Sequence, residues 1–388
     1  MLQGIRVVEL ATYIAAPAAC ALLADWGAEV IKVEAPGGDP QRQFFGFTGD
    51  QFAENRVFDL DNRGKRSIVL DLRQESERET LRALIASADI FLTNTRAASL
   101  ERMGLDWETL KASNPRLIYA HLSGYGTKGP EAAKPGFDIA AYWARSGLGW
   151  LTTVKGGEPP MLRTGIGDHG ASLALLSGVM AALFHRERTG EGQKIESSLL
   201  RTGVYVGGSE HAIQLQLGKL ASPRPREQAG NPLSNFFRSA EGRWFIIVPR
   251  TGGDGEWPQI ARAAGRADLI GDPRFAGFRQ RRTHAAELIA ALDEGFAAME
   301  WPQIAAALEA EDLIFSPVQS IGEVTRDPQA LAAGCYQPFA GEDALIPNGP
   351  IDFGVAVAAA RRAPALDADG EAIRRELAEA MAVRDPAR

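Results

Sequence analysis

The N-terminal segment most strongly constrains the fold. It contains an apolar strand-like run at residues 5–10, a short apolar helix at 17–26 and a second strand-like run at 29–34. A strand, helix and strand in such close succession predict a β-α-β unit, hence a parallel sheet with a right-handed crossover. Glu34 ends the second strand, where dinucleotide folds hold a ribose, but the turn at 11–17 lacks their glycine fingerprint. We therefore expect a nucleotide-type α/β fold without a pyrophosphate loop.

Polar segments follow or flank three further predicted strands. They are the basic cluster around the strand at 67–72 (Arg63, Lys65, Arg66 and Arg73), the segment Asn94, Thr95 and Arg96 after the strand at 90–93, and the glycine-rich loop 123–130 after the strand at 117–121. The carboxyl ends of parallel strands meet at one edge, where open α/β sheets bind ligands. The basic cluster keeps two interpretations open, a solvated surface or a grip on phosphates.

Asp168 stands directly before a run of small and apolar residues at helical spacing, within the stretch 163–184. The pattern predicts a helix with Asp168 at or near its N-terminus, where free N–H groups and the helix dipole favour negative charge. Such an aspartate is commonly a helix cap. Gly165, Gly167 and Gly170 indicate a second interpretation, because a carboxylate without bulky neighbours is accessible as a nucleophile. Both interpretations stand at this point.

The same three glycines match the dinucleotide fingerprint G-x-G-x-x-G, which requires a strand directly before it. Residues 158–163 contain two prolines, and prolines are not expected in a central strand. A nicotinamide site at this place, and with it an oxidoreductase, is therefore disfavoured.

A chain of 388 residues, 45% hydrophobic and 23% charged, is long enough for two or more domains. We expect the first part of a large domain over 1–200 and a linker over 201–224. A small α+β domain over 225–320 contains a predicted hairpin at 236–248, where apolar and polar residues alternate around Glu241 and Gly242. Residues 321–388 would form a second linker and return to the large domain.

Charge and cysteine content limit the partners and the compartment. The net charge of −7 argues against nucleic acid or an anionic membrane as the main partner. The chain has two cysteines, no signal-peptide pattern and no apolar run as long as a membrane span. We therefore expect a cytoplasmic protein. Its histidines and cysteines are not spaced as metal ligands, so no metal site is predicted.

Ordered motifs along nearly the whole chain resemble family III CoA-transferases, the CaiB/BaiF type. These motifs are G-I-R-V-V-E-L, G-A-E-V-I-K-V-E-A-P-G-G-D-P, N-R-G-K-R-S-I-V-L-D-L, N-P-R-L-I-Y-A-H-L-S-G-Y-G-T-K-G-P, G-D-H-G at 167–170 and H-R-E-R-T-G-E-G-Q-K-I-E-S-S-L at 185–199. The segments 11–19, 134–138 and 231–232 are most similar to the branch of the family that acts on 2-hydroxy and aryl acids.

The resemblance implies that Asp168 is the nucleophile, that CoA passes through an aspartyl-CoA thioester, and that no metal or permanently bound cofactor takes part. Coenzyme A is then a co-substrate, and an acyl-CoA and a free acid are the partners. The family's fold is a Rossmann-like large domain with a parallel sheet built from both chain ends, a small inserted domain, and an interlocked homodimer. By motif position, the CoA contacts would be Ile14, Ala15, Leu70, Asp71, Leu72, Arg73, Asn94, Thr95, Arg96, Arg102, Pro135, Gly136, Phe137 and Asp138.

Several positions depart from the family's formyl-CoA transferases and racemases. Ala35 stands where formyl-CoA transferases carry a CoA-binding arginine, and their tetraglycine loop is absent, so oxalate and formate are not expected as substrates. Phe137 stands where racemases carry a proton-transferring histidine, which disfavours epimerisation. His169 is expected to pack against or orient Asp168. A 2-hydroxy, aryl or branched acid is the expected substrate class; an α-methylacyl-CoA epimerase and a non-catalytic CoA-binding protein are the alternatives.

Overall fold

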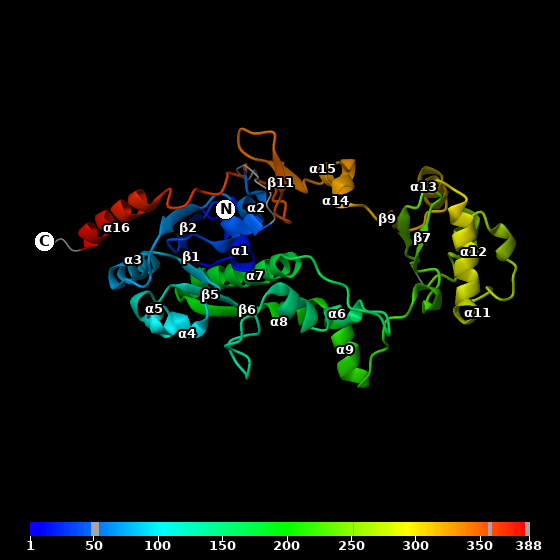
Figure 1. Cartoon of the computed structure of the whole chain (residues 1–388), viewed down its shortest axis with the longest axis horizontal. Helices are drawn as coiled ribbons and strands as arrows, with labels where there is room; N and C mark the ends of the chain where they lie inside the picture. Colours follow the sequence, from blue (N-terminus) through cyan, green and yellow to red (C-terminus); the bar gives the residue numbers. More distant parts are fainter. Residues whose placement is uncertain (48–53, 251, 356–358, 385–388) are drawn as a thin grey trace. The chain divides into compact units, whose positions relative to one another are not determined.

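A six-stranded parallel sheet forms the centre of the larger of two structural units (Figure 1). The computed structural model describes residues 1–47, 54–250, 252–355 and 359–384. The predicted α/β class is confirmed. The large unit comprises Met1–Leu151, Pro160–Leu220 and Gln329–Arg388, and the small unit comprises Thr152–Pro159 and Ala221–Pro328.

All neighbouring strands of the large sheet run parallel, in the order β3-β2-β1-β4-β5-β6. The chain steps outward from β1 to β3, then returns to the other side of β1 to add the remaining strands. This order leaves a topological switch point between β1 and β4, where open α/β sheets bind ligands at the carboxyl edge. The strands are β1 (Arg6–Leu10), β2 (Glu29–Glu34), β3 (Arg66–Val69), β4 (Ile90–Thr93), β5 (Ile118–Ser123) and β6 (Gln193–Ser198).

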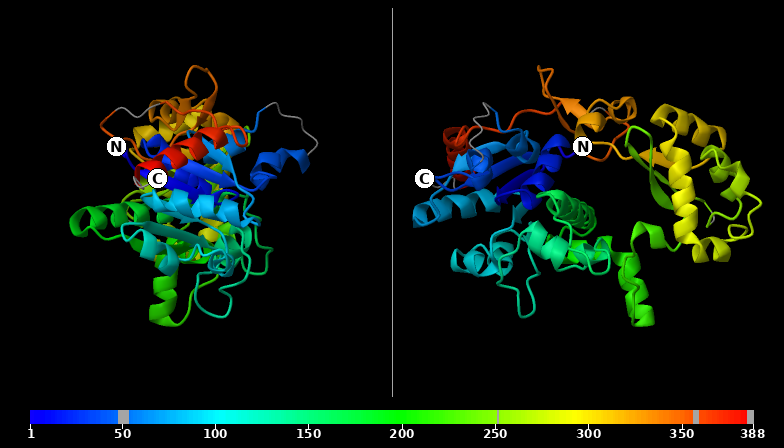
Figure 2. Two further views of the ribbon diagram at one scale, coloured as in Figure 1. Left: turned by 90° about the vertical axis from the view of Figure 1, so that its left-hand side faces the viewer. Right: turned by 45° about the vertical axis from the view of Figure 1, so that its right-hand side comes forward.

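Helices cover both faces of this sheet (Figure 2). Successive strand residues point to opposite faces, so Val7 packs on one side and Val8 on the other. Two apolar faces explain why the strands read as nearly continuous apolar runs. The helices are α1 (Ala15–Asp25) and α7 (Ile166–Thr189) on the side of Val7, and α3 (Glu75–Ala86), α4 (Ala97–Arg102), α5 (Trp107–Ser113) and α16 (Gly370–Arg384) on the side of Val8.

The prediction of a sheet built from both chain ends is wrong. Within the described residues, all six strands come from residues 6–198. The C-terminal segment returns to the large unit as a covering helix, because α16 packs against β3 and α3 and buries Ile373. Arg66 pairs with Glu376 at 2.8 Å, and Arg374 pairs with Glu77 at 2.9 Å. These contacts attach α16 to the outer edge of the sheet.

Helix α7 brings its first turn to the carboxyl edge of the sheet. It packs against α1, β5 and β6, and a short turn at 190–192 leads from its end into β6. Because β6 is parallel to the other strands and starts where α7 ends, α7 must begin at the opposite edge, where the strands end. By length and mean hydropathy α7 is one helix that could cross a membrane, but nearly half of its apolar window is buried in the large unit, as in a core helix.

Shorter elements complete the large unit around the sheet. A π-helix, η2, precedes α7 in the chain and packs against both α7 and α8. A two-stranded antiparallel hairpin stands apart from the main sheet. These elements are η1 (Pro40–Phe47), α2 (Arg56–Asn62), η2 (Asp138–Ala144), α6 (Leu148–Leu151), α8 (Leu199–Val206), α9 (Gly208–Leu217), α15 (Pro328–Ala332), β10 (Tyr336–Pro338) and β11 (Leu345–Pro347).

The small unit has its own antiparallel sheet, in the order β7-β8-β9, and its own core. The hairpin predicted around Glu241 and Gly242 is confirmed by the pairing of β7 with β8. Phe237, Phe245 and Phe296 pack together between this sheet and the helices. The elements are η3 (Arg226–Gln228), β7 (Asn235–Arg238), β8 (Trp244–Ile247), α10 (Trp257–Ala263), η4 (Ala267–Leu269), α11 (Phe278–Thr283), α12 (Ala285–Ala297), α13 (Trp301–Ala310), β9 (Phe315–Pro317) and α14 (Ile321–Val324).

Candidate active site

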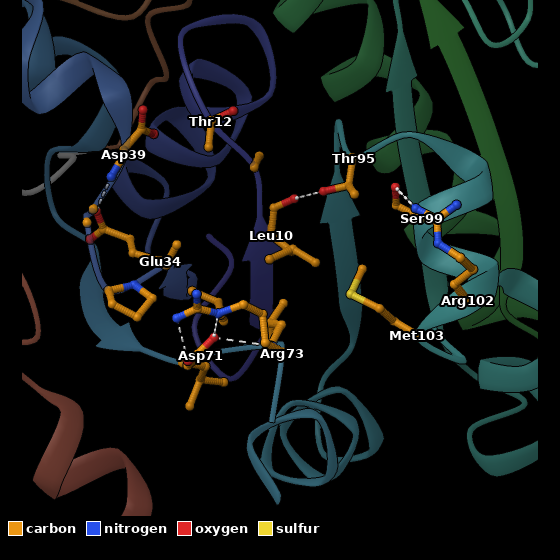
Figure 3. A pocket seen from close by; sticks show the side chains of 18 residues that line it. Leu10, Thr12, Glu34, Asp39, Asp71, Arg73, Thr95, Ser99, Arg102 and Met103 are labelled. Carbon is orange, nitrogen blue, oxygen red and sulfur yellow. Dashed lines mark hydrogen bonds and ion pairs between the residues drawn. The ribbon is translucent and has the colours of Figure 1, made fainter. Parts of the chain in front are cut away.

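A crevice of about 640 Å³ opens at the carboxyl ends of β1, β2, β3 and β4 (Figure 3). It spans the switch point of the sheet, where a nucleotide-type fold binds its ligand. Ala35 lines this crevice. It stands where formyl-CoA transferases carry a CoA-binding arginine. Six predicted CoA contacts line the crevice, namely Leu70, Asp71, Leu72, Arg73, Thr95 and Arg102; the other lining residues are 10–12, 33–39, Ser99 and Met103.

Two arginines, Arg73 and Arg102, are among the residues that line the crevice. Arg102 Nη2 donates to Ser99 Oγ at 3.0 Å, and Arg73 pairs with Asp71 at 2.8 Å while remaining 85% exposed. The hydrogen bond from Arg73 holds the pKa of Asp71 well below its usual range. Guanidinium groups match the geometry of phosphate oxygens, so the crevice offers two cations to a nucleotide. Arg96 stands exposed at the N-cap of α4, outside the lining set.

Glu34 is committed to partners within the protein. Arg42 donates from Nε and Nη2 to both carboxylate oxygens at 2.7 Å, and Ser67 Oγ donates to one of them at 2.7 Å. Burial opposes ionisation, but these hydrogen bonds prevail and lower the pKa of Glu34. Residues 152–164, all described, contain no strand before the G-x-G-x-x-G pattern. Both features of a dinucleotide site are therefore missing.

The loop after β1 is tied to the next strand along the sheet. Asn94 accepts from Thr12 N at 3.1 Å and donates to Thr12 O at 2.8 Å. Ile14 and Ala15 are buried at the start of α1. None of Asn94, Ile14 and Ala15 lines the crevice. Asn94 thus holds the loop at the crevice rim by hydrogen bonds without lining the crevice itself.

Asp168 lies in the first turn of α7, at the same edge of the sheet as the crevice. The N-cap is Gly165, whose φ of 96° requires a glycine, and no side chain caps the helix. Asp168 is therefore not a capping residue. A Cβ on Gly167 would lie 2.6 Å from the ring of Tyr142, so that glycine serves close packing rather than access to Asp168.

The Asp168 carboxyl has an unusual environment. Burial is the main cause that raises its pKa to about 7, and the negative charge of Asp138 adds to it, while His169 acts in the opposite direction. Among the described residues no side chain or backbone group hydrogen-bonds to the Asp168 carboxyl. A half-buried carboxylate without a compensating donor is a candidate nucleophile.

His169 forms a pair with a buried acid. Its Nε2 lies 3.0 Å from Asp61 Oδ1, and Gln41 Nε2 donates to the other oxygen of Asp61 at 2.8 Å. The Asp61 side chain is 1% exposed, whereas that of His169 is 43% exposed. Burial lowers the pKa of His169, but the hydrogen bond and charge of Asp61 prevail and raise it. The pair places positive charge beside Asp168, a role that the sequence did not reveal for Asp61.

The turn at 135–138 reaches the start of α7 rather than the crevice. Asp138 is buried, and its Oδ2 accepts from Gly165 N at 2.7 Å. Its carboxyl thus holds the N-cap of the helix that carries Asp168. Phe137 is 60% exposed, and Gly136 packs closely against Gly124. With Pro135, all four residues lie outside the crevice lining.

A buried ionic network lies below the loop after β1. Glu9 and Lys32 are register partners on β1 and β2, and Lys32 Nζ lies 2.9 Å from Glu9 and 2.8 Å from Asp39. Lys65 Nζ lies 2.6 Å from the other oxygen of Glu9. The side chains of Glu9, Lys32 and Lys65 are fully buried. Burial opposes ionisation of Glu9, but the two lysines prevail and lower its pKa.

Together these features define an enzyme of the group-transfer type. The crevice and the Asp168 carboxyl share one edge of the sheet, and the nearby polar side chains of Asn94, Asp138 and Asp61 are hydrogen-bonded within the protein. A carboxylate in this position can attack an activated acyl group carried by a nucleotide-bearing substrate.

Comparisons with known proteins agree with this class. Residues 2–370 match the model of CoA-transferase family III. The chain is 37% identical over 336 residues to cinnamoyl-CoA:phenyllactate CoA-transferase of Clostridium sporogenes, covering 86% of this chain and 81% of the relative. It is 35% identical over 335 residues to (R)-2-hydroxy-4-methylpentanoate CoA-transferase of Clostridioides difficile, covering 86% and 83%. A crystal structure of a CAIB/BAIF family protein from Brucella suis matches with a TM-score of 0.87 at 33% identity, covering 97% and 99%.

The chain belongs to CoA-transferase family III, and the family resemblance of its motifs is confirmed. It is a CoA-transferase, an enzyme that moves CoA between carboxylic acids and uses CoA thioesters as substrates.

Proposed function

We propose that this enzyme transfers CoA through a thioester formed on Asp168. The observation that carries the proposal is the carboxyl itself, half-buried in the first turn of α7, free of hydrogen-bond donors among the described residues and raised in pKa to about 7. Desolvation makes such a carboxylate a stronger base and nucleophile than one in water.

The reaction proceeds in four acyl transfers. The Asp168 carboxylate attacks the donor thioester, the C–S bond breaks, and a mixed anhydride and CoA thiolate result. The thiolate then attacks the aspartyl carbonyl, which releases the donor acid and leaves an aspartyl-CoA thioester. The acceptor carboxylate attacks this thioester and expels CoA thiolate again. Finally the thiolate attacks the acceptor acyl group, which forms the new acyl-CoA and restores Asp168 with no net proton change.

The first turn of α7 supports the oxyanions that each step forms. The N–H group of Gly165 is occupied by Asp138, whereas the next amides, of residues 166–168, have no acceptor within the helix. These amides and the positive end of the helix dipole favour negative charge near Asp168. His169, paired with Asp61, adds a further positive group.

CoA itself would occupy the crevice at the switch point. Arg73 and Arg102 are the proposed phosphate ligands, with Arg96 at the rim, because all three have guanidinium groups exposed or in the crevice wall. Leu70, Leu72 and Thr95 would contact the nucleoside and pantetheine. Ile14 and Asp138 contact Gly165 at the start of the helix that carries Asp168, so these two residues and their neighbours Ala15 and 135–137 would lie at the thioester end. Asn94 would act indirectly, by holding the loop at the crevice rim.

The proposed acids are 2-hydroxy acids with an aryl or branched side chain. The names of the two curated relatives support this, because phenyllactate and 2-hydroxy-4-methylpentanoate are both 2-hydroxy acids with an apolar side chain. The test is CoA exchange from a panel of acyl-CoA donors to labelled acids, in the wild type, Asp168→Asn and the surface control Asp268→Asn. We expect transfer to these acids in the wild type and the control. Transfer that survives Asp168→Asn would contradict the covalent route.

We also propose that two copies of this chain form a homodimer. Helix α9 buries none of its residues in this chain, and Leu215 and Leu217 on it are 86% and 61% exposed. A surface of this kind is typical of an interface. Light scattering during gel filtration should give twice the chain mass of 41.7 kDa. A mass equal to one chain would contradict the dimer.

A further inference from the structure

Tyr13 holds a backbone conformation that side chains rarely adopt. Its φ is 64°, and among the described non-glycine residues only Asp312 and Asp367 share a positive φ. Aspartate tolerates this region, but for a bulky aromatic residue it is a strained conformation. A glycine would fit without that strain, so the ring of Tyr13 is present despite it.

Buried groups hold the Tyr13 backbone in place. Tyr13 N donates to Asp39 Oδ1 at 3.1 Å, and the fully buried Asp39 side chain pairs with Lys32 at 2.8 Å. Lys32 Nζ also donates to Ala11 O at 3.1 Å. Asn94 is hydrogen-bonded to both the N–H and the carbonyl group of Thr12. The backbone from Ala11 to Tyr13 is thus held by buried or hydrogen-bonded groups at each residue.

The ring meets a second aromatic side chain. Tyr13 and Phe137 pack edge to face, with centroids 5.4 Å apart and an interplanar angle of 84°. Tyr13 is 42% and Phe137 60% exposed. The pair therefore presents an exposed aromatic surface, although the two residues come from segments distant in the chain.

This surface lies beside the helix start that carries Asp168. Ile14 Cδ1 lies 3.4 Å from the position of a Cβ on Gly165, and Asp138 Oδ2 accepts from Gly165 N at 2.7 Å. Tyr13 directly precedes Ile14 in the chain, and Phe137 directly precedes Asp138. Each ring therefore belongs to a residue whose chain neighbour contacts the N-cap of α7.

We propose that Tyr13, with Phe137 as its partner, is the specificity-determining wall for the apolar side chain of the acyl group that reaches Asp168. This inference rests on the proposed function for the place of the acyl group. An aromatic pair held in a strained but fixed position contacts an aryl or branched group without loss of side-chain entropy. A short acyl group would not reach it.

The test is calorimetric binding of cinnamoyl-CoA and acetyl-CoA to Tyr13→Gly, in an Asp168→Asn background that prevents turnover. Glycine keeps the left-handed backbone and removes only the ring. In the background protein we expect cinnamoyl-CoA to bind about 10-fold more tightly than acetyl-CoA, since one aromatic contact contributes about a factor of ten. Tyr13→Gly should reduce this ratio to below about 3-fold and leave acetyl-CoA binding unchanged.

Two controls keep the outcome specific to Tyr13. Tyr13→Phe should keep the ratio, and Phe278→Ala, at an exposed aromatic residue of the small unit, should also keep it. An unchanged ratio in Tyr13→Gly, or equal weakening of both ligands, would overturn the inference. No acceptor acid is present in this assay, so it measures acyl-CoA binding whether or not Asp168 is the nucleophile. The CoA exchange assay decides the role of Asp168 separately.

Discussion

Two carboxylates of the large unit, the fully buried Glu9 and the half-buried Asp168, show opposite electrostatic arrangements. Glu9, within the sheet, has a lysine on each carboxylate oxygen, and its pKa is lowered. Asp168, at the carboxyl edge, has no hydrogen-bond donor among the described residues, and its pKa is raised to about 7. The first carboxylate is compensated and stabilises the frame. The second is uncompensated and is available for chemistry, which is the pattern expected of a reactive group.

Glu9→Gln should give the largest change in the stability of this frame. The substitution leaves Lys32 and Lys65 buried with less compensation, so we expect a loss of about 3–5 kcal/mol in the free energy of unfolding. Urea unfolding followed by circular dichroism measures it. Glu29→Gln is the matched control, because its pairs with Arg6 and Arg66 are part-exposed, and it should cost less than about 1 kcal/mol. Equal losses would remove the distinction between the buried network and a surface pair.

Asp168→Asn should change stability in the opposite direction. The folded pKa of about 7 lies above the ordinary value of 3.8, so the folded state binds the proton more tightly and wild-type stability falls as pH rises from about 4 to 7. Asparagine has no charge to bury. At pH 8 the variant should therefore be roughly 1–3 kcal/mol more stable than the wild type, with the difference lost near pH 4. A variant less stable than the wild type at pH 8 would mean that the Asp168 carboxylate is compensated after all.

Catalysis should follow the ionisation of Asp168. Because attack requires the carboxylate, kcat/KM for CoA transfer should fall about 10-fold per pH unit below an apparent pKa near 7. Steady-state rates between pH 5.5 and 9, on an acceptor acid ionised throughout, measure this. An acidic limb near pH 4 would place Asp168 in an environment as compensated as that of Glu9.

His169→Gln should shift the same pH profile of kcat/KM to higher pH. The charge of His169 lowers the pKa of Asp168, against burial and Asp138. Without that charge the acidic limb should move to higher pH, so kcat/KM should fall about 3- to 10-fold at pH 6 and much less at pH 9. Asp61→Asn removes the partner of His169 and also a negative charge that raises the pKa of Asp168, so it should move the acidic limb less than His169→Gln does. A loss that is equal at every pH would indicate only a structural role for His169.

Arg102→Ala should change CoA binding alone, because Arg102 lines the crevice and contacts neither carboxylate. Loss of one charged phosphate contact should raise KM for the acyl-CoA about 10-fold and leave kcat nearly unchanged. Arg279→Ala, an exposed arginine of the small unit, is the control. A fall in kcat with constant KM would place Arg102 nearer the reacting atoms than the crevice geometry indicates.

The sequence predicted those parts of the fold that local patterns encode. The β-α-β unit, the hairpin at 236–248 and a helix start at Asp168 each depend on residues close together in the chain. The crevice at the strand ends follows from parallel topology alone. The expected contribution of the C-terminal end to the sheet was wrong, because it came from the family resemblance and not from a strand pattern in those residues, which pack on the sheet as the helix α16.

The supporting residues of the site could not be predicted, because they depend on long-range pairing. Asp61 meets His169 across 108 residues of sequence, and the conformation of Tyr13 depends on Asp39 and the sheet beneath it. The sequence did contain one indication of a buried ion pair. Glu9 and Lys32 carry opposite charges within otherwise apolar strands, and their pairing explains why both charges are tolerated there. Register alone, which the sequence does not fix, places them together.

The most direct test of the account is to trap the covalent intermediate. The wild-type enzyme is incubated with cinnamoyl-CoA, treated with hydroxylamine, digested and examined by mass spectrometry. The account predicts a hydroxamate on Asp168 that requires the acyl-CoA and is absent when CoA replaces it. An unmodified Asp168 in an enzyme that transfers CoA under the same conditions would contradict the central claim.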